Sequence, residues 1–491
     1  MRHFNREPGP VVTPEILITA FTGKAAHNVN GLTAHTAFSL IMTERNQEHS
    51  NSISPEALNT LRVKLKNLKL IIIDEISMMG LSTFEKINNR LMQVFQTKKE
   101  FGGRSIITFG DFQQLRPVND SFIFGTSRNS LSHLFGNPLW EKFKIFELTE
   151  IMRQRDDLIF AQLLGRLAKG KLTQSDINLI KTRTFVENPR DLKAGDKLLP
   201  DKGKKSCHLI WQNALVEEHN SRRIQELRGP NSTAITFRAV DKITGANSEV
   251  EKRQVRFNLQ NLSYRQTQGL MTELLLQKGV KYMITTNIDV ADGLYNGAVG
   301  ELMFMEFKGG QLEAIYLKFE DASIGRKARS VRRGIMEATT AIDTAWTPIT
   351  RVKLTFHVTK NPAQVVREQY PLVPAEAYTI HKSQGSTLES VTVVLVPRMT
   401  RQLIYVAFSR AKTLDGLHII GRFIPPTPPR DDDPVVIEMK RLRDTAQFIP
   451  KFQHLKIVPA NEIQIVSFNV QSIRKHIDSV KSDAVFMNSH T

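Results

Sequence analysis

Cysteine is almost absent from this chain of 491 residues, in which Cys207 is the only one. A single cysteine excludes an intrachain disulfide and is typical of a reducing compartment. Long apolar runs are also missing, since none approaches the ~20 residues that a membrane-spanning helix requires. The first residues lack the apolar centre of a signal peptide. We therefore expect a soluble intracellular protein with no membrane partner.

Acidic residues are fewer than basic residues: the chain has 49 Asp and Glu and 67 Lys and Arg, which gives a formal net charge of +18. A balance this basic favours a polyanionic partner, of which nucleic acid is the commonest. A basic surface kept only for solubility is the alternative. The length of the chain predicts two or three domains, each large enough to bury a core.

The most informative segment is an apolar run, Leu70–Ile73, that ends in Asp74 and Glu75. Its β-branched residues predict a buried parallel strand. Two carboxylates at the carboxyl end of such a strand lie where open α/β sheets bind ligands, and their desolvation requires a positive partner. Mg²⁺ carried by a nucleotide triphosphate fits this need, with Asp74 holding the metal through water and Glu75 orienting the attacking water. The alternative is a strand that merely leads into a capped helix.

Strands and helices alternate around this segment, which predicts an α/β fold with helices on the faces of a parallel sheet. Between about 287 and 372, short alternating runs such as Gly300–Met305 and Ala314–Phe319 instead predict a small antiparallel β domain. The other expected strands are Ile16–Ala20, Ser105–Phe109 and Ile145–Leu148, and the expected helices are Thr83–Phe95, capped by Ser82, and Leu158–Leu167.

Six short motifs follow one another along the chain, and their order is more specific than any one of them. They are Ala20–Ala26, Asp74–Glu75, Gly110–Val118, Leu148–Gln154, Tyr378–Leu388 and Tyr405–Ala411. The set resembles superfamily one DNA helicases of the RecD-like, PIF (petite integration frequency) type, and more narrowly the helicase portion of Helitron-like transposons. The resemblance covers about 16 to 423. It implies two RecA-like parallel-sheet domains with a small inserted SH3-like β domain.

The same resemblance implies a site for ATP and Mg²⁺. Guanidinium groups suit the charge of a phosphoryl-transfer transition state, and Gln114 is placed to hydrogen-bond a γ-phosphate. Arg153 taken alone is equally consistent with a surface salt bridge. The implied catalytic residues are Glu75, Arg153 and Arg410, and the implied nucleotide-binding residues are Asp74, Gln114 and Gly385, with Asp74 also on the metal.

The resemblance also implies that the protein contacts single-stranded DNA and duplex junctions. It further implies a monomer that moves 5′ to 3′ along the DNA. Phosphate contacts need no base identity, which suits a motor that passes any sequence. The implied contact residues are Thr22, Lys24, His35 and Thr36 in the first domain, and His381, Lys382, Ser383 and Gln384 in the second.

One motif of the family is missing from the printed sequence. A phosphate loop needs G-x-x-x-x-G-K followed by Ser or Thr. Here Gly23-Lys24 is followed by Ala25, and the position five residues before Gly23 is Ile18. Because related helicases carry the loop upstream of Ala20, we expect the chain to be truncated at its start and to bind and turn over ATP weakly.

The carboxyl-terminal part carries a second resemblance. Ile463–Arg474 predicts a strand entering a helix and resembles the opening of the endonuclease/exonuclease/phosphatase family, in which the Asn, here Asn469, begins the metal and phosphate site. A plain strand and helix is the alternative. The predicted segments are 1–142 for the first RecA-like domain, 143–286 and 373–423 for the second, 287–372 for the SH3-like insertion, 424–460 for a proline-stiffened linker and 461–491 for a truncated nuclease start.

The leading hypothesis is an ATP-dependent DNA helicase that acts in repair, recombination, telomere maintenance or transposition. We expect it in the nucleus, with the mitochondrion as a second compartment. One alternative is a non-catalytic nucleic-acid-binding remnant that lacks the phosphate loop. The other is a RecA-type ATPase that acts on RNA or as a switch.

Overall fold

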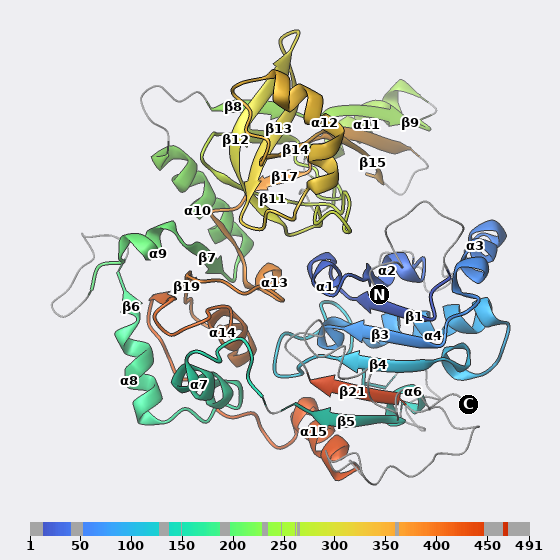
Figure 1. Ribbon diagram of the computed structural model, residues 1–491, viewed down its shortest axis with the longest axis vertical. Helices are drawn as coiled ribbons and strands as arrows, with labels where there is room; N and C mark the ends of the chain where they lie inside the picture. Colours follow the sequence, from blue (N-terminus) through green and yellow to red (C-terminus); the bar gives the residue numbers. More distant parts are fainter. Residues whose placement is uncertain are drawn as a thin grey trace. The chain divides into compact units, whose positions relative to one another are not determined.

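The structure is a computed structural model with two compact units, whose helices and strands are labelled in Figure 1. Unit 1 consists of Met1–Leu198, Ser383–Ser390 and Leu395–Thr491, and unit 2 consists of Leu199–Lys382 and Val391–Val394. The described residues are 13–40, 53–126, 137–148, 150–186, 197–227, 234–246, 248–260, 262, 266–358, 363–445 and 465–469.

Unit 1 is built on a six-stranded sheet in the order β2-β1-β3-β4-β21-β5, and every neighbouring pair is parallel. The carboxyl ends of all six strands therefore lie at one edge of the sheet. Figure 1 shows β21, the last strand among the described residues, between β4 and β5. The strands are β1 (Ile16–Ala20), β2 (Leu32–Thr33), β3 (Leu70–Asp74), β4 (Ser105–Phe109), β5 (Phe143–Glu147) and β21 (Ile465–Asn469).

Apolar side chains hold helices against this sheet. In α4, Phe84, Ile87 and Leu91 recur at helical spacing and are fully buried in a core shared with Ile71 and Ile73 of β3. The helices of this part are α1 (Gly23–Asn28), α2 (Ala34–Ala37), α3 (Pro55–Leu65), η1 (Ile76–Met78), α4 (Leu81–Phe95), η2 (Glu100–Gly103) and α6 (Pro138–Glu141).

The predicted cap of α4 is wrong. Ser82 lies inside the helix, where its hydroxyl donates to Asp120 Oδ2 at 2.5 Å, and Gly80 is the N-cap residue. An added Cβ on Gly80 would lie only 2.1 Å from the Asp120 carboxylate. The Asp120 contact therefore sets where the helix begins, and a local capping pattern does not contain that information.

The remainder of unit 1 contains a second, smaller α/β part in which β20 pairs in parallel with β6. The predicted helix from 158 is confirmed as α7. The elements are α7 (Leu158–Ala168), α8 (Gln174–Thr182), β6 (Thr184–Phe185), α14 (Arg401–Phe408), β20 (Leu417–Ile420) and α15 (Pro434–Asp444), and α13 (Ile380–Ser383) ends at the first residue of the 383–390 segment.

Unit 2 combines a parallel part with antiparallel sheets. Strands β18, β7 and β19 are parallel neighbours, while β14-β13-β12-β11-β17, β15-β16-β9 and β10-β8 form antiparallel sheets. The strands are β7 (Cys207–Ile210), β8 (Ile235–Arg238), β9 (Val240–Thr244), β10 (Glu273–Leu276), β11 (Lys281–Ile284), β12 (Val299–Lys308), β13 (Gln311–Phe319), β14 (Thr347–Ile349), β15 (Val352–His357), β16 (Gln364–Gln369), β17 (Leu372–Pro374), β18 (Ala377–Thr379) and β19 (Val391–Val394). The helices are α9 (Asp201–Lys205), α10 (Asn213–Glu226), α11 (Glu249–Leu259) and α12 (Arg326–Ala338).

The structure differs from the predicted segments in three places. Antiparallel strands already begin at Ile235, before the predicted start at 287, and the predicted all-β insertion contains helix α12. Within the predicted linker 424–460, Pro434–Asp444 forms α15, whose N-cap Asp433 accepts from Val435 N at 2.9 Å. None of the described helices is both long and apolar enough to cross a membrane.

Candidate functional site

The paired carboxylates lie at the carboxyl end of β3, as predicted. Glu75 adopts the left-handed conformation, with φ 54° and ψ 46°, and its N–H donates to Asp74 Oδ1 at 2.8 Å. This turn lets the chain leave the strand at once and enter η1. A non-glycine residue with positive φ is uncommon and frequently marks a functional site.

Both carboxylates keep some exposed surface, yet their surroundings are largely desolvated. Burial raises the pKa of Asp74 to about 8, and the Glu75 charge adds to this rise. Burial also raises the pKa of Glu75, whereas the guanidinium groups of Arg410 and Arg153 lower it. Two desolvated acids beside one another favour a bound cation, because a cation stabilises the ionised forms.

The next strand adds a third acid to the same edge of the sheet. Asp111 follows β4 through Gly110, and its Oδ2 accepts from the Tyr405 hydroxyl of α14 at 3.1 Å. A Cβ added to Gly110 would lie 2.8 Å from Ile76 Cγ2 and 3.0 Å from Ile76 N. Glycine at this position therefore allows the ends of β3 and β4 to approach closely.

Two arginines provide the positive charge of the site. Arg410, which is 1 % exposed, donates to Val406 O at 2.8 Å and to Ser386 O at 3.2 Å. Burial, and then the charge of Arg153, lower the pKa of Arg410 to about 9. Arg153 donates through Nε to Thr387 Oγ1 at 3.0 Å and through Nη1 to Ser409 O at 3.2 Å. The charge of Glu75 also acts on Arg153, and the role of this arginine stays a prediction.

The loop after α13 lies beside the carboxylate of Glu75. A Cβ on Gly385 would lie 3.7 Å from Glu75 Oε1, and this glycine has φ +74°. The carboxamide of Gln384 lies beside Glu75 and lowers its pKa. Gln384 and Ser383 are 5 % and 0 % exposed, so their side chains are poorly placed to touch a DNA strand directly.

The predicted nucleic-acid residues of the first domain gather at the carboxyl ends of β1 and β2. Thr22 caps α1, because its hydroxyl accepts from Ala25 N at 3.2 Å. Thr36 is exposed and its hydroxyl lies 2.8 Å from Thr33 Oγ1. Lys24 Nζ donates to the hydroxyl of Ser386, which connects this edge to the Gly385 loop. His35 packs edge-on against the Phe21 ring, and its pKa is lowered by burial and by Lys86.

His381 and Lys382 lie in α13, directly after β18 of unit 2, and both are half-buried. Unit 1 therefore contains Thr22, Lys24, His35, Thr36, Ser383 and Gln384, while unit 2 contains the other two predicted contacts. Which of these side chains touch nucleic acid stays a prediction.

Sequence reasoning assigned no role to Asp111 or Tyr405, although both stand in the quoted motifs. The signal for Asp111 was an acid directly after a second buried strand, at the edge already marked by Asp74. Tyr405 carried no comparable signal, because only the packing of α14 brings its hydroxyl to Asp111. In the described part of the chain, no three His, Cys, Asp or Glu residues form a group that would hold a metal alone.

The site has the chemistry to receive a polyanion together with a divalent cation. Carboxylate oxygens suit a hard cation and guanidinium groups suit phosphate oxygens. Two acceptor atoms, Gln114 Oε1 and Gln384 Oε1, are buried without a hydrogen-bond partner among the described residues. Such atoms require a partner, which a bound ligand or its water would supply.

Comparison with known proteins finds that the chain is similar to a group of helicases. Residues 12–177 match the family model described as PIF1-like helicase, and residues 340–421 match the core domain of viral superfamily 1 RNA helicases. The chain is 27% identical over 449 residues to the ATP-dependent DNA helicase PIF1 of Emericella nidulans, covering 84% of this chain and 54% of that protein. It is 28% identical over 410 residues to PIF1 of Xenopus laevis, covering 82% and 54%. The chain thus spans about half the length of these relatives.

Solved structures share the fold. Pif1 from Candida albicans superposes with a TM-score of 0.61 at 23% identity, covering 88% of this chain and 89% of the other. Bacteroides Pif1 bound to single-stranded DNA gives a TM-score of 0.60 at 22% identity, covering 88% of each chain. These likenesses confirm the predicted α/β, RecA-like fold. The SH3-like form of the inserted β domain and the Helitron resemblance stay predictions.

The close approach at Gly110 generates a testable expectation. Gly110→Ala places a methyl group against Ile76 and the backbone of η1, so it should lower the free energy of unfolding by about 1–3 kcal/mol, the usual range for overpacking. Gly165→Ala is the matched control, since a Cβ there meets nothing within 4 Å on the exposed face of α7. Alanine should stabilise that helix by about 0.5–1 kcal/mol. Thermal unfolding of the two variants measures both effects, and equal stabilisation would contradict the close approach.

Proposed function

Since this chain is related to the PIF1-like helicases, we propose that it is the motor region of an ATP-dependent DNA helicase. The observation that carries the proposal is the convergence of Asp74 and Glu75 with Arg153 and Arg410 at one edge of a parallel sheet. Paired acids facing paired guanidinium groups match the needs of phosphoryl transfer, in which positioning and charge stabilisation supply most of the catalysis.

The proposed cofactors are ATP and Mg²⁺, and the residues present fit them. Asp74 would hold the cation through water, Glu75 would orient the attacking water, and Gln114 would donate its amide to the γ-phosphate. The cation supplies charge neutralisation at the phosphates when it is bound. Arg410 and Arg153 offer planar donors that stay ionised, since even the lowered pKa of Arg410 is about 9. Gly385 leaves open the space in front of Glu75.

A second candidate function is nucleic-acid binding without hydrolysis. The observation that favours it is that the printed sequence has no G-x-x-x-x-G-K followed by Ser or Thr. Without the amides and lysine of such a loop, the site keeps residues for the metal and the water but holds triphosphate weakly. The two candidates differ in turnover and agree on binding to nucleic acid.

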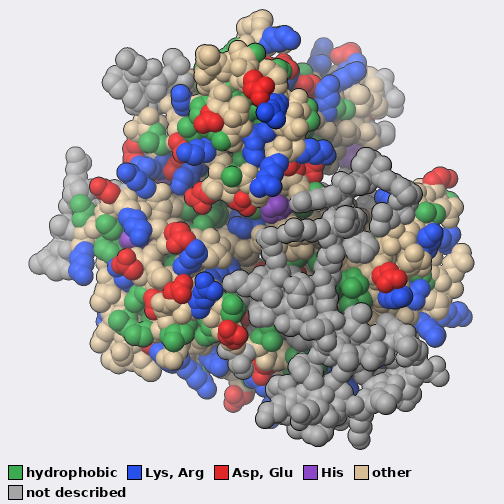
Figure 2. Space-filling model, viewed as in Figure 1, with side chains coloured by type: hydrophobic (Ala, Val, Ile, Leu, Met, Phe, Trp, Pro, Cys, Tyr) green, Lys and Arg blue, Asp and Glu red, His purple; other side chains and the backbone are tan. Residues whose placement is uncertain are grey.

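The proposed partner is single-stranded DNA next to a duplex junction. We propose that a monomer binds this DNA without sequence preference and moves along it 5′ to 3′. The net charge of +18 supports a polyanionic partner. On the face shown in Figure 2, Lys and Arg side chains are interspersed with Asp and Glu over the described surface. Substitution of a single motif residue such as Lys382 therefore tests the proposed DNA-binding residues more specifically than the overall charge does. The proposed location is the nucleus, where the protein would act on genomic DNA, with the mitochondrion as a second compartment. This proposal rests on the resemblance alone.

ATP turnover separates the two candidate functions. The 491-residue chain should show little DNA-stimulated hydrolysis, because nothing in its sequence forms a phosphate loop. When a relative's phosphate-loop strand is fused upstream, turnover should appear. Glu75→Gln should then remove hydrolysis while sparing ATP binding, and Arg410→Ala should lower turnover by roughly three orders of magnitude.

Glu56→Gln on the exposed first turn of α3 serves as the control and should leave turnover unchanged. Phosphate release in a coupled assay measures the turnover of the 491-residue chain, the fused protein and each variant. Normal helicase turnover by the 491-residue chain, lost in Glu75→Gln, would show that phosphate is held elsewhere. A fused protein indifferent to Glu75→Gln and Arg410→Ala would refute the site itself.

Binding to single-stranded DNA should not require ATP. Affinity should fall steeply with salt as counterions are released from phosphates. Lys382→Ala should weaken binding to all sequences alike and reduce the salt slope by about one, because a phosphate contact carries no base information. Fluorescence anisotropy with labelled oligonucleotides of differing sequence measures both quantities.

Lys412→Ala is the matched control, since this exposed lysine is paired with Glu389 and lies outside the predicted contact set. It should change neither affinity nor slope. If Lys382→Ala behaves like this control, the excess of basic residues serves solubility, and the predicted set of DNA-binding residues is wrong.

A further inference from the structure

A proline-rich segment of unit 1 lies between β20 and α15. It consists of Ile424–Arg430, in which four of the seven residues are proline. Proline fixes its own φ near about −65° and pushes the residue before it towards extended backbone, so closely spaced prolines favour a polyproline II helix. The structure describes residues 422–429 throughout and places none of them in an α-helix, a strand or a turn. The segment therefore has the backbone that its prolines predict.

Both ends of this segment are held by other parts of unit 1. At its start, Phe423 is buried, and the centre of its ring lies 5.9 Å from that of Phe408 in α14. At its end, Arg430 O accepts from Asp433 N at 3.0 Å, and the Asp433 carboxylate pairs with Arg116 at 3.5 Å. These contacts fix the two points between which the segment runs.

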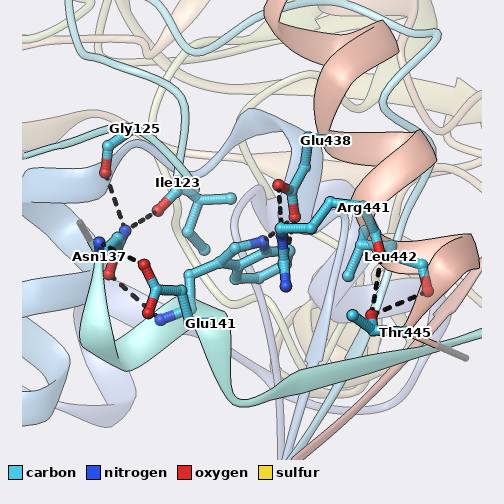
Figure 3. A network of polar contacts seen from close by, with 9 residues as sticks. Ile123, Gly125, Asn137, Glu141, Glu438, Arg441, Leu442 and Thr445 are labelled. Carbon is cyan, nitrogen blue, oxygen red and sulfur yellow. Dashed lines mark hydrogen bonds and ion pairs between the residues drawn. The ribbon is translucent and has the colours of Figure 1, made fainter.

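Helix α15 begins directly after Asp433 and strengthens the second of these anchors. Trp140 Nε1 donates to Glu438 Oε1 at 2.6 Å, and Arg441 donates to the same oxygen at 2.6 Å. Figure 3 shows Glu438 and Arg441 close to the helix that carries Glu141. A segment that is anchored at both ends loses little conformational entropy when a partner binds to it.

Between the anchors, the backbone of the segment lies against the turn that joins α7 to α8. Gly170 in this turn has φ +66°, and a Cβ added there would lie 2.5 Å from Thr427 O and 2.7 Å from Pro428 Cα. Only glycine allows so close an approach. One side of the segment therefore faces its own protein.

Exposure along the segment repeats every third residue, which is about the repeat of a polyproline II helix. Pro426 and Pro429 are half-buried, whereas the other five residues are exposed, among them Ile424 at 65%. Residues three apart share one edge of such a helix, so Pro426 and Pro429 form an inward edge. The two outward edges consist of Ile424, Thr427 and Arg430, and of Pro425 and Pro428.

The exposed residues match a recognition pattern. Pro425, Pro428 and Arg430 have the spacing P-x-x-P-x-Arg. Exposed prolines at this spacing pack against the aromatic side chains that line the groove of an SH3 domain, and the polyproline helix is already formed before it binds. The guanidinium group of Arg430 adds a charge at a fixed distance from the prolines, which complements a carboxylate at the end of such a groove.

We propose that Ile424–Arg430 is a docking site for a partner protein whose groove is lined by aromatic side chains and ends in an acidic residue, as in an SH3 domain. The outward prolines pack against the aromatic rings, and Arg430 pairs with the acid. Asp431 and Asp432 are exposed next to Arg430, but the turn closed by Asp433 N and Arg430 O leads the chain away from the line of the polyproline helix. The proposal stands independently of nucleotide hydrolysis and of DNA binding.

Binding of a purified SH3 domain that prefers P-x-x-P-x-Arg ligands to the 491-residue chain tests the proposal. Calorimetric titration should give micromolar affinity, and the outward variants Pro425→Ala, Pro428→Ala and Arg430→Ala should each weaken binding by at least about tenfold. The matched controls Pro426→Ala and Pro429→Ala remove the same ring from the inward edge, so they should stay within about twofold of the original chain. Thermal unfolding of every variant checks that unit 1 remains folded.

Other roles of the segment give different results. If its prolines only stiffen the connection to α15, the SH3 domain does not bind, and this result overturns the proposal. Equal weakening by inward and outward proline variants, or unchanged binding by Arg430→Ala, would overturn it as well. So would tighter binding of a WW domain to the same chain, or a dimer in light scattering that is lost in Pro428→Ala, since a different partner or a second copy would then cover the segment.

Discussion

The desolvated acids at the end of β3 constrain everything around them. Asp74 and Glu75 are adjacent, and burial raises both of their pKa values; the charge of Glu75 further raises the pKa of Asp74, and the charge of Asp111 raises that of Glu75. Guanidinium groups of Arg410 and Arg153 offset part of this cost. Because these arginines come from the turn after α14 and from the segment after β5, distant parts of unit 1 must meet before the acids are compensated. The folding of unit 1 and the assembly of its candidate site are therefore the same event.

Contacts around the acids make this arrangement specific. Arg410 is held by the carbonyls of Val406 and Ser386, and Tyr405 donates to Asp111 on the neighbouring strand. Helix α14 thus contacts the segment after β4 through Tyr405, and the turn after α14 contacts the Gly385 loop through Arg410. A ligand that enters between the acids and the arginines would contact groups from three separate segments of unit 1.

The parts of the fold that depend on local pattern were predicted from the sequence. The apolar, β-branched runs at Ile16–Ala20, Leu70–Ile73 and Ser105–Phe109 correspond to β1, β3 and β4, and the acids after β3 marked the site edge. Features that depend on distant contacts were not predictable in this way. Ser82 near the start of α4 donates to Asp120, Trp140 donates to Glu438 of α15, and the side chain of Gln384 lies beside Glu75. A strand at the carboxyl-terminal part was expected, but its place between β4 and β5 is a pairing between segments distant in the sequence, which no local pattern contains. The expected helix after it lies outside the described residues.

Equilibrium binding of Mg²⁺-ATP tests most directly whether Arg410 faces a site for a triphosphate and its cation, as we propose. Arg410→Lys keeps the charge but loses the planar fork that binds two phosphate oxygens. Lys412→Arg is the reciprocal control at an exposed position. Calorimetric titration of the folded proteins should show weak binding to the original chain and affinity at least about tenfold lower for Arg410→Lys, a difference of about 1.4 kcal/mol. Lys412→Arg should match the original chain. Equal affinity in all three proteins would contradict the account.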